Sequence, residues 1–169
     1  MEVITIEQLR REDLGSAATW LSRNEINRWL TSEWRNRVVY PTVLAIALRN
    51  PKNRLFLVRF NGEACGLTAL ADIDVADATA MIWYLLGESG FSRRGIASEA
   101  VKQLVRKSFH ELKLQSLYAW VMEDNVASAR LLQRVGFREV GRIRQAASSN
   151  GRQVDRIYFD LVASEQPGI

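Results

Sequence analysis

A polar loop between a strand and a helix is the feature that most constrains what this chain can fold into. The loop runs from Gly90 to Ala100. It follows Thr79–Leu86, a run of large apolar and aromatic residues without glycine or proline, which is typical of a strand. It leads into 97–112, where apolar residues recur at three- and four-residue spacing and polar residues fill the other face. The sequence therefore predicts a strand, a loop and the longest amphipathic helix of the chain.

Such a loop is suited to binding an anion, because it brings free backbone N–H groups and the positive end of a helix dipole to one point. Its glycine would let a phosphate approach the main chain, two arginines add permanent charges, and a serine hydroxyl offers one more hydrogen bond. The residues predicted to bind the anion are Arg93, Arg94, Gly95, Ile96, Ala97 and Ser98. The alternative is a short loop with solvated arginines and a helix-starting glycine.

Residues 1–50 are expected to hold one short strand and several helical segments. Val3–Ile6 is predicted to be the strand, and Asp13 is predicted to cap the helix that follows it. Pro41 is predicted to open another short helix. Between these helices, Asn24–Trp34 mixes tryptophans with charged residues and is interpreted as too polar on every side to be core. It is expected to form a lid over a site, the alternative being a surface segment with aromatic anchors.

The rest of the chain alternates strands with helices. Asn61-Gly62 and Asn150-Gly151 are typical of type I′ turns, so each predicts a hairpin. Strands are predicted over 55–60, 63–73, 79–86, 117–121, 138–145 and 153–161, and a helix over 125–135. Because there is no internal repeat and no linker, residues 1–163 are expected to form one mixed α/β domain, followed by a loose tail at 164–169.

The composition indicates a soluble globular domain. Of the 169 residues, 47% are hydrophobic and 25% charged, and no apolar run approaches the ~20 residues that a membrane span needs. The single cysteine, Cys65, excludes an internal disulfide, and with the absence of a signal peptide it indicates a cytoplasmic protein without a membrane partner. The net charge of +4 favours anionic ligands, but the arginines are spread along the chain, which disfavours nucleic acid. The sequence is also compatible with a homodimer.

Residue counts exclude several catalytic chemistries. The only histidine, His110, lies on the polar face of the predicted helix, so neither a Ser-His-Asp triad nor a Cys-His pair is available. One cysteine and one histidine cannot form a zinc site, so no metal is expected, and the motifs of nucleoside triphosphate and dinucleotide binding are absent. The remaining chemistry is one in which a ligand brings the reactive group and the protein positions it.

Two segments resemble the Gcn5-related N-acetyltransferase (GNAT) family. Ser92–Ala97 is similar to its acetyl-CoA pyrophosphate loop, and Asn125–Phe137 to its next helix with a Gly-Phe ending, at the family's spacing. The resemblance extends over nearly the whole chain and is closest to the branch of ribosomal-protein N-terminal, spermidine and nucleotide-amino-sugar acetyltransferases. It implies an α/β domain with a mostly antiparallel central sheet flanked by helices, and acetyl-CoA as the co-substrate.

The resemblance also implies roles for residues outside the loop. Backbone groups of Leu85 and Leu86 would pair with the pantetheine arm, and Asn125 and Ser128 would reach the cofactor from the next helix. The amine would enter from the opposite side, under the lid segment. The residues expected to contact it are Trp29, Trp34 and Asp74.

The family's usual acid and base are missing from their places. The frequent tyrosine acid falls at Leu132, and a glutamate common on the strand before the loop falls at Met81. Catalytic substitutes are expected from Tyr84, Asp72 and Glu88, the alternative being solvated loop residues. The thiolate can also leave unassisted, because a thiol with a pKa of about 8.5 is a tolerable leaving group at neutral pH.

The predicted function is therefore a cytoplasmic N-acetyltransferase that moves an acetyl group from acetyl-CoA to a primary amine by direct attack. A polyamine, an amino sugar and a peptide or protein N-terminus are the candidate acceptors. One alternative is a catalytically weak acyl-CoA-binding domain that regulates a partner, which the missing tyrosine favours. A third interpretation, an RNA-binding accessory domain, is favoured only by the high isoelectric point.

Overall fold

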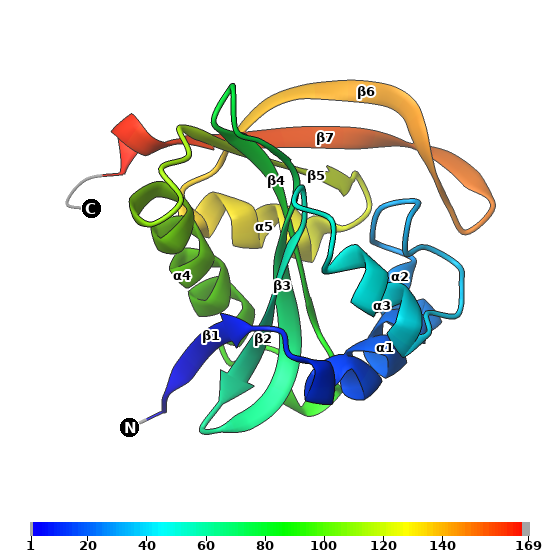
Figure 1. Cartoon of the computed structure of the whole chain (residues 1–169). Helices are drawn as coiled ribbons and strands as arrows, with labels where there is room; N and C mark the ends of the chain where they lie inside the picture. Colours follow the sequence, from blue (N-terminus) through cyan, green and yellow to red (C-terminus); the bar gives the residue numbers. More distant parts are fainter. Residues whose placement is uncertain (1, 167–169) are drawn as a thin grey trace.

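Seven strands form one sheet in the order β1-β2-β3-β4-β5-β7-β6, in a computed structural model that describes residues 2–166 (Figure 1). The strands are β1 (Ile4–Gln8), β2 (Arg54–Phe60), β3 (Glu63–Asp74), β4 (Thr79–Leu86), β5 (Ser116–Met122), β6 (Arg138–Ser149) and β7 (Arg152–Val162). The helices are α1 (Leu14–Ser22), α2 (Asn24–Asn27), α3 (Pro41–Ala47), α4 (Ile96–His110) and α5 (Val126–Val135). All neighbouring strands are antiparallel except β4 and β5, which are parallel. The predicted α/β fold with a mostly antiparallel sheet is confirmed.

Both predicted hairpins are present, because their turn residues adopt the left-handed conformation that a type I′ turn requires. The φ angles are 50° at Asn61 and 86° at Gly62, and 49° at Asn150 and 75° at Gly151. Gly136, with φ 113°, likewise ends α5. The turn chemistry read from the sequence therefore set the register of β2 against β3 and of β6 against β7.

Helices cover both faces of the sheet (Figure 1). The apolar residues of α1 and α3 pack with Leu57, Leu67 and Trp83 on one face. Those of α4 and α5 pack with Leu70 and Ile82 on the other. The amphipathic pattern of α4 explains its position, because its apolar side is buried on the sheet while its charged side faces solvent. No helix within residues 2–166 is long and apolar enough to cross a membrane.

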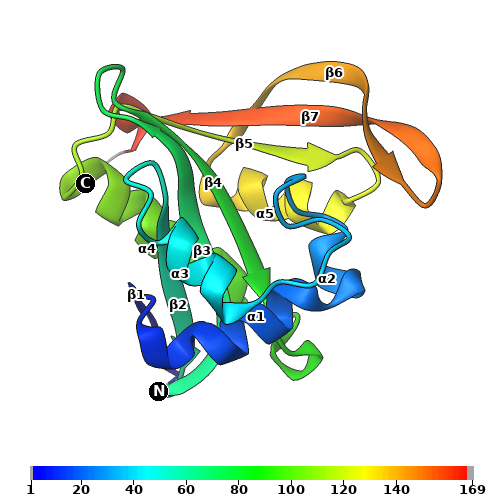
Figure 2. The same ribbon diagram turned by 45° about the vertical axis from the view of Figure 1, so that its right-hand side comes forward.

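The parallel strands β4 and β5 pair only at their starts. Thr79–Met81 is in register with Ser116–Tyr118, and no pairing joins the two strands beyond this point. Each strand keeps its outer neighbour: β4 pairs with β3 as far as Leu86, and β5 pairs with β7 as far as Met122. Figure 2 shows the two strands diverging. The sheet therefore contains a wedge-shaped opening whose edges carry backbone groups without a partner strand.

The expectation that the segment 24–34 is too polar to be core is wrong. Asn27, Leu30 and Trp34 are buried, and Trp34 is only 2% exposed. The buried amide of Asn27 is satisfied because its Nδ2 donates to the carbonyl oxygens of Leu21 (2.9 Å) and Arg37 (3.1 Å). Without a regular period, the buried positions of this segment left no pattern in the sequence.

The expectation that Asp13 caps α1 is also wrong. The Asp13 side chain makes no capping bond to α1; its Oδ2 instead accepts from the backbone N–H of Arg10 (3.3 Å). The tail predicted to be loose from residue 164 begins with a 3-10 turn, Ala163–Glu165, and Glu165 forms an ion pair with Arg138 (2.7 Å). Residues 167–169 of that tail lie outside the described part of the chain.

Candidate active site

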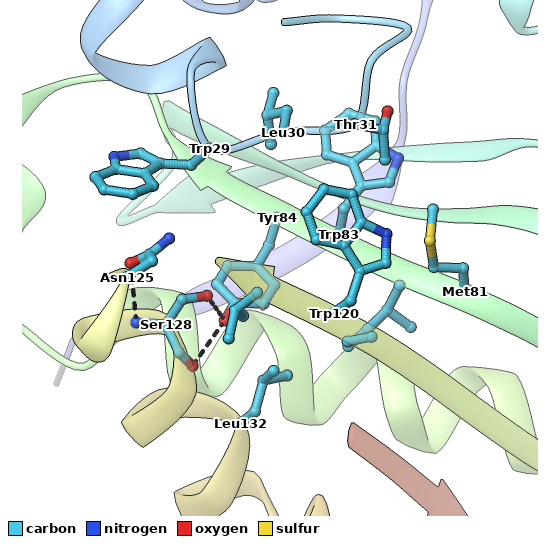
Figure 3. A pocket seen from close by; sticks show the side chains of 13 residues that line it. Trp29, Leu30, Thr31, Met81, Trp83, Tyr84, Trp120, Asn125, Ser128 and Leu132 are labelled. Atoms are coloured by element: carbon cyan, nitrogen blue, oxygen red, sulfur yellow. Dashed lines mark hydrogen bonds between the residues drawn. The ribbon is translucent and has the colours of Figure 1, made fainter. Parts of the chain in front are cut away.

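A cavity of about 60 Å³ lies where β4 and β5 separate (Figure 3). Three groups of residues line it: the segment after α2, the facing stretches of the two strands, and the start of α5. The lining residues are Trp29, Leu30, Thr31, Met81, Ile82, Trp83, Tyr84, Ala119, Trp120, Val121, Asn125, Ser128 and Leu132. Because the first group comes from the α1–α3 side and the last from the α4–α5 side, the cavity lies between the two helical layers.

Three polar side chains meet on the α5 side of this cavity. The hydroxyl oxygens of Tyr84 and Ser128 lie 2.6 Å apart, and the Tyr84 hydroxyl also donates to the Ser128 carbonyl oxygen (3.3 Å). The Oδ1 of Asn125 accepts from the Ser128 backbone N–H (3.3 Å) and so caps α5. Burial raises the pKa of Tyr84 to about 12, although the bond from Ser128 opposes the shift. Tyr84 is therefore a neutral hydrogen-bonding group at physiological pH.

The loop before α4 has the backbone of an anion-binding site. Arg93 (φ 63°) and Gly95 (φ 75°) are both in the left-handed region, on either side of Arg94. Alternation of this kind turns successive N–H groups towards one point. From Arg93 to Ser98, no backbone N–H donates to an acceptor within residues 2–166, and Glu99 is the first whose N–H is used, by the Gly95 carbonyl (3.0 Å). A Cβ on Gly95 would have no atom within 4 Å, so the space above the loop is open.

The two arginines of the loop differ in their surroundings. Arg94 Nη2 forms an ion pair with Glu2 (2.6 Å), and its guanidinium stacks on the ring of Phe60 at 4.3 Å. Arg93 is exposed and has no ion pair or side-chain hydrogen bond within the described residues. Of the two, Arg93 is therefore the one free to meet an incoming anion.

Close backbone packing holds the end of β4 in place. A Cβ on Gly66 of β3 would lie 2.3 Å from the Leu85 carbonyl oxygen, and a Cβ on Gly87 would lie 2.3 Å from the indole of Trp20. The Gly87 N–H donates to the Cys65 carbonyl oxygen (2.7 Å). Only glycine fits at these two positions, and the backbone of Leu85 and Leu86 is consequently positioned by β3 and α1.

Glu88, predicted as a catalytic residue, is already engaged by two partners. Arg23 binds both of its carboxylate oxygens at 3.1 Å, and Trp20 Nε1 donates to Oε1 (3.1 Å). These hydrogen bonds, the one from Arg23 first, lower the pKa of Glu88. The residue joins the end of β4 to α1, and its catalytic role stays a prediction.

The carboxylates at the start of the β4–β5 opening form a separate group. Asp72 has φ 49° in an irregular part of β3 and is exposed. Partial burial and then the negative charge of Asp72 raise the pKa of Glu33, a residue that sequence reasoning passed over. Burial and the same charge raise the pKa of Tyr118. Asp74 lies beyond this group, where its Oδ1 accepts from the Asp77 N–H (3.0 Å) and shapes the turn to β4.

The two tryptophans predicted to contact a substrate occupy different positions. Trp29 is partly exposed and lines the cavity. Trp34 is buried and packs against Trp83, with ring centroids 6.0 Å apart, so it supports the cavity wall. Leu132 and Met81, at the positions where the family's acid and base were expected, both line the cavity, and Leu132 is 0% exposed. The polar group nearest in kind to the missing acid is Tyr84, which comes from β4 and not from α5.

No group of three or more His, Cys, Asp or Glu side chains within residues 2–166 is arranged to hold a metal ion. The cavity itself presents aromatic walls, the Tyr84–Ser128 hydroxyl pair and unpaired strand edges.

Comparison with known proteins identifies the class. Residues 4–138 match the family model described as acetyltransferase (GNAT) domain, and the chain belongs to this family. The predictions of a GNAT fold and of an N-acetyltransferase are thereby confirmed.

Individual relatives agree with this class. The chain is 27% identical to the uncharacterized N-acetyltransferase p20 of Bacillus licheniformis, over 99% of this chain and 97% of the relative. It is 29% identical to the putative ribosomal N-acetyltransferase YdaF of Bacillus subtilis (strain 168), over 64% of this chain and 59% of the relative. Among solved structures, spermidine N-acetyltransferase from Vibrio cholerae in complex with CoA and spermine superposes with a TM-score of 0.86 at 20% identity, over 95% of this chain and 96% of that one. At that identity the likeness concerns the fold.

Proposed function

We propose that this protein transfers an acetyl group from acetyl-CoA to a primary amine by direct attack. The observation that carries the proposal is the cavity between β4 and β5, lined from both helical layers. Two substrates that enter from opposite faces would both be bound there at the same time, so neither has to leave before the other binds. A direct reaction needs this geometry, and it needs no nucleophile from the protein.

The residues around the cavity fit acetyl-CoA. The unused N–H groups from Arg93 to Ser98 would hold the pyrophosphate, with Arg93 adding a charge. The free backbone edge at Leu85 and Leu86 would pair with the pantetheine arm, and Asn125 and Ser128 would border it from α5. When bound, acetyl-CoA supplies an activated thioester: the amine nitrogen bonds to the acetyl carbon, the carbon–sulfur bond breaks, and the thiol leaves.

The acceptor amine loses two protons in this reaction, and the departing thiolate gains one. The ammonium form loses the first proton before attack, since only about one part in a thousand is neutral at pH 7 for a pKa of about 10, and the nitrogen loses the second to water as the amide forms. We assign the first loss to Asp72 together with Glu33, because the raised pKa of Glu33 makes its carboxylate a better base than an ordinary one. A backbone N–H of β4 between Tyr84 and Leu86 would stabilise the negative oxygen as the carbonyl is attacked.

The departing sulfur needs a proton to become a thiol. Tyr84 would be the hydroxyl group to approach it, but its pKa of about 12 exceeds that of a thiol by about 3.5 units, so full transfer would be uphill by about 5 kcal/mol. We therefore propose that Tyr84 donates a hydrogen bond to the thiolate and keeps its own proton. Water protonates the thiolate after CoA has been released. The reaction then needs no acid in place of the tyrosine that Leu132 replaces.

Amine-dependent release of free thiol from acetyl-CoA tests this function. A positive result is release that requires both the amine and the intact loop, and that is lost in Gly95→Val. The alternative, a regulatory acyl-CoA-binding domain, is favoured by the apolar side chains of Leu132 and Met81 at the positions of the usual acid and base. Tight acetyl-CoA binding without thiol release for any amine would support that alternative. A cytoplasmic location and a homodimer are part of the proposal and are tested by fractionation and by light scattering.

A further inference from the structure

Three arginines on the acceptor side of the cavity have no anionic partner. They are Arg28, Arg35 and Arg156, from the segment after α2 and from β7. The Nε atom of each is buried and makes no hydrogen bond, and none of the three forms an ion pair within residues 2–166. Buried donors are nearly always satisfied in folded proteins, so three unsatisfied Nε atoms in one neighbourhood require an explanation.

Two of these arginines contact side chains that line the cavity. The Arg28 guanidinium stacks on Trp29 at 4.3 Å, and the Arg156 guanidinium stacks on Trp120 at 4.2 Å. Both tryptophans line the cavity, as Figure 3 shows. The stacking fixes the planes of two cations at the rim of the place where the amine must react.

The third arginine lies close to the others. Burial, and then the positive charge of Arg156, lower the pKa of Arg35. The single side-chain hydrogen bond of Arg35 within the described residues is a long one, from Nη1 to the Ser148 carbonyl oxygen (3.4 Å). Arg28 and Arg35 share a polar hollow of about 220 Å³ with Asn24, Asn36 and the tip of the β6–β7 hairpin. The hollow and the two stacked cations form one positively charged rim.

The acidic groups near the β6–β7 hairpin do not pair with the three arginines. Asp124 reaches the hairpin, but its Oδ2 accepts from the Ser149 hydroxyl (2.6 Å) and makes no ion pair with the three arginines. Glu123 and Asp155 are both paired with Arg142. Like charges held together with unsatisfied donors destabilise the free protein, and an anion that binds all three removes this cost.

We propose that the acceptor amine carries a carboxylate or phosphate group, which binds Arg28, Arg35 and Arg156 while the amino group reaches the cavity. The proposal rests on the acetyltransferase function proposed above and names its substrate class. Guanidinium groups bind both kinds of anion through paired N–H···O bonds, and the tryptophans beneath them offer flat apolar contact to the body of the acceptor. A polyamine fits poorly, because its second ammonium group would meet this positive rim.

Matched acceptors test the proposal. Glucosamine 6-phosphate is compared with glucosamine, and serine with serinamide, with spermidine as a polycationic acceptor. At least one anionic member should have a kcat/KM tenfold or more above its neutral partner, and the pair that shows it distinguishes phosphate from carboxylate. In Arg35→Gln and in Arg156→Gln, kcat/KM for that anionic acceptor should fall tenfold or more, with less than a twofold change for its neutral partner and for the KM of acetyl-CoA. Arg49→Gln, an exposed arginine after α3, is the control of equal charge change and should leave all values unchanged.

A binding measurement keeps the proposal testable without turnover. With CoA at saturation to occupy the loop, inorganic phosphate should raise the melting temperature of the wild-type protein and of Arg49→Gln, but not of the double variant Arg35→Gln/Arg156→Gln. No stabilisation of the wild type by phosphate would overturn the proposal. The proposal would also be overturned if the arginine variants lost kcat/KM equally for both members of each pair, or if they changed only the KM of acetyl-CoA. A higher kcat/KM for spermidine than for every anionic acceptor would overturn it as well. Thiol release that is absent for every amine, with phosphate stabilisation intact, would instead remove the proposed function and leave the anion site standing.

Discussion

The hydroxyl of Tyr84 makes the pH dependence of turnover informative. A tyrosine with the ordinary pKa of about 10 is half ionised at pH 10, whereas one at about 12 is only about 1% ionised there. In the role proposed for it the group would act in its protonated form, and its folded pKa is raised, so its contribution would be lost only as the pH approaches 12. We expect kcat to rise as the amine deprotonates and to show no falling limb up to about pH 10.5.

The size of the Tyr84 contribution follows from its proposed role. A hydrogen bond to a charged group is worth about 1.5–3 kcal/mol, so Tyr84→Phe should lower kcat by about ten- to 150-fold and leave the KM of acetyl-CoA unchanged. Tyr40→Phe, at an exposed position, is the matched control and should change neither value. Ser128→Ala should have a smaller effect, because it removes only the partner that orients the phenol.

The assay is thiol release from acetyl-CoA between pH 6 and about pH 10.5, with a blank lacking amine subtracted at each pH. Because the pKa of Tyr84 is higher in the folded protein than in the unfolded chain, ionisation of the unfolded chain lowers the stability of the fold above about pH 10. Circular dichroism at each pH is therefore measured to exclude unfolding. A falling limb with a midpoint near pH 10 that disappears in Tyr84→Phe would show that this tyrosine ionises during turnover and would refute the reasoning. A kcat within twofold of the wild type in Tyr84→Phe would remove the hydroxyl from the reaction.

Further predictions concern the loop, the sheet and the missing acid. Gly95→Val should abolish acetyl-CoA binding in calorimetry while the protein stays folded, because valine strains a residue at φ 75° and enters the open space above the loop; unchanged affinity would exclude the loop. Arg93→Ala should weaken CoA binding more than Arg94→Ala does, and neither should affect a pantetheine fragment without phosphates; equal losses for both ligands would contradict a charge role. Gly66→Ala should lower thermal stability and raise the KM of acetyl-CoA together, since its Cβ would collide with the Leu85 carbonyl; a variant with normal values would show that β4 adjusts. Leu132→Tyr should change kcat by less than about tenfold, and a hundredfold gain would mean that the wild type is an impaired enzyme.

The sequence predicted the elements whose signals are local. The turns at Asn61-Gly62 and Asn150-Gly151, the full extent of β4 and the loop at Gly95 were all predicted, because each depends on backbone preferences or on short-range periodicity. The early end of the β4–β5 pairing was not predicted from the residues, because strand register depends on partners far apart in the sequence.

The acceptor side shows where sequence reasoning stops. Trp34 looked like a surface residue because its neighbours are charged, yet it packs on Trp83 of a distant strand. The arginine group joins Arg28 and Arg35 to Arg156, which lies near the other end of the chain. The raised pKa of Glu33 depends in the same way on Asp72. These residues come together only when the chain folds. The sequence showed an excess of arginine but not where on the surface the arginines would gather.

The opening between β4 and β5 leaves a gap in the hydrogen-bond ladder of this sheet. Peptide groups line the gap at the usual ladder spacing, so an extended, amide-bearing ligand that entered it would act as a temporary strand. The two halves of the sheet, joined without it by the short pairing of Thr79–Met81 to Ser116–Tyr118, would then be bridged along their length. The rigidity of the molecule would accordingly follow the concentration of its own substrate.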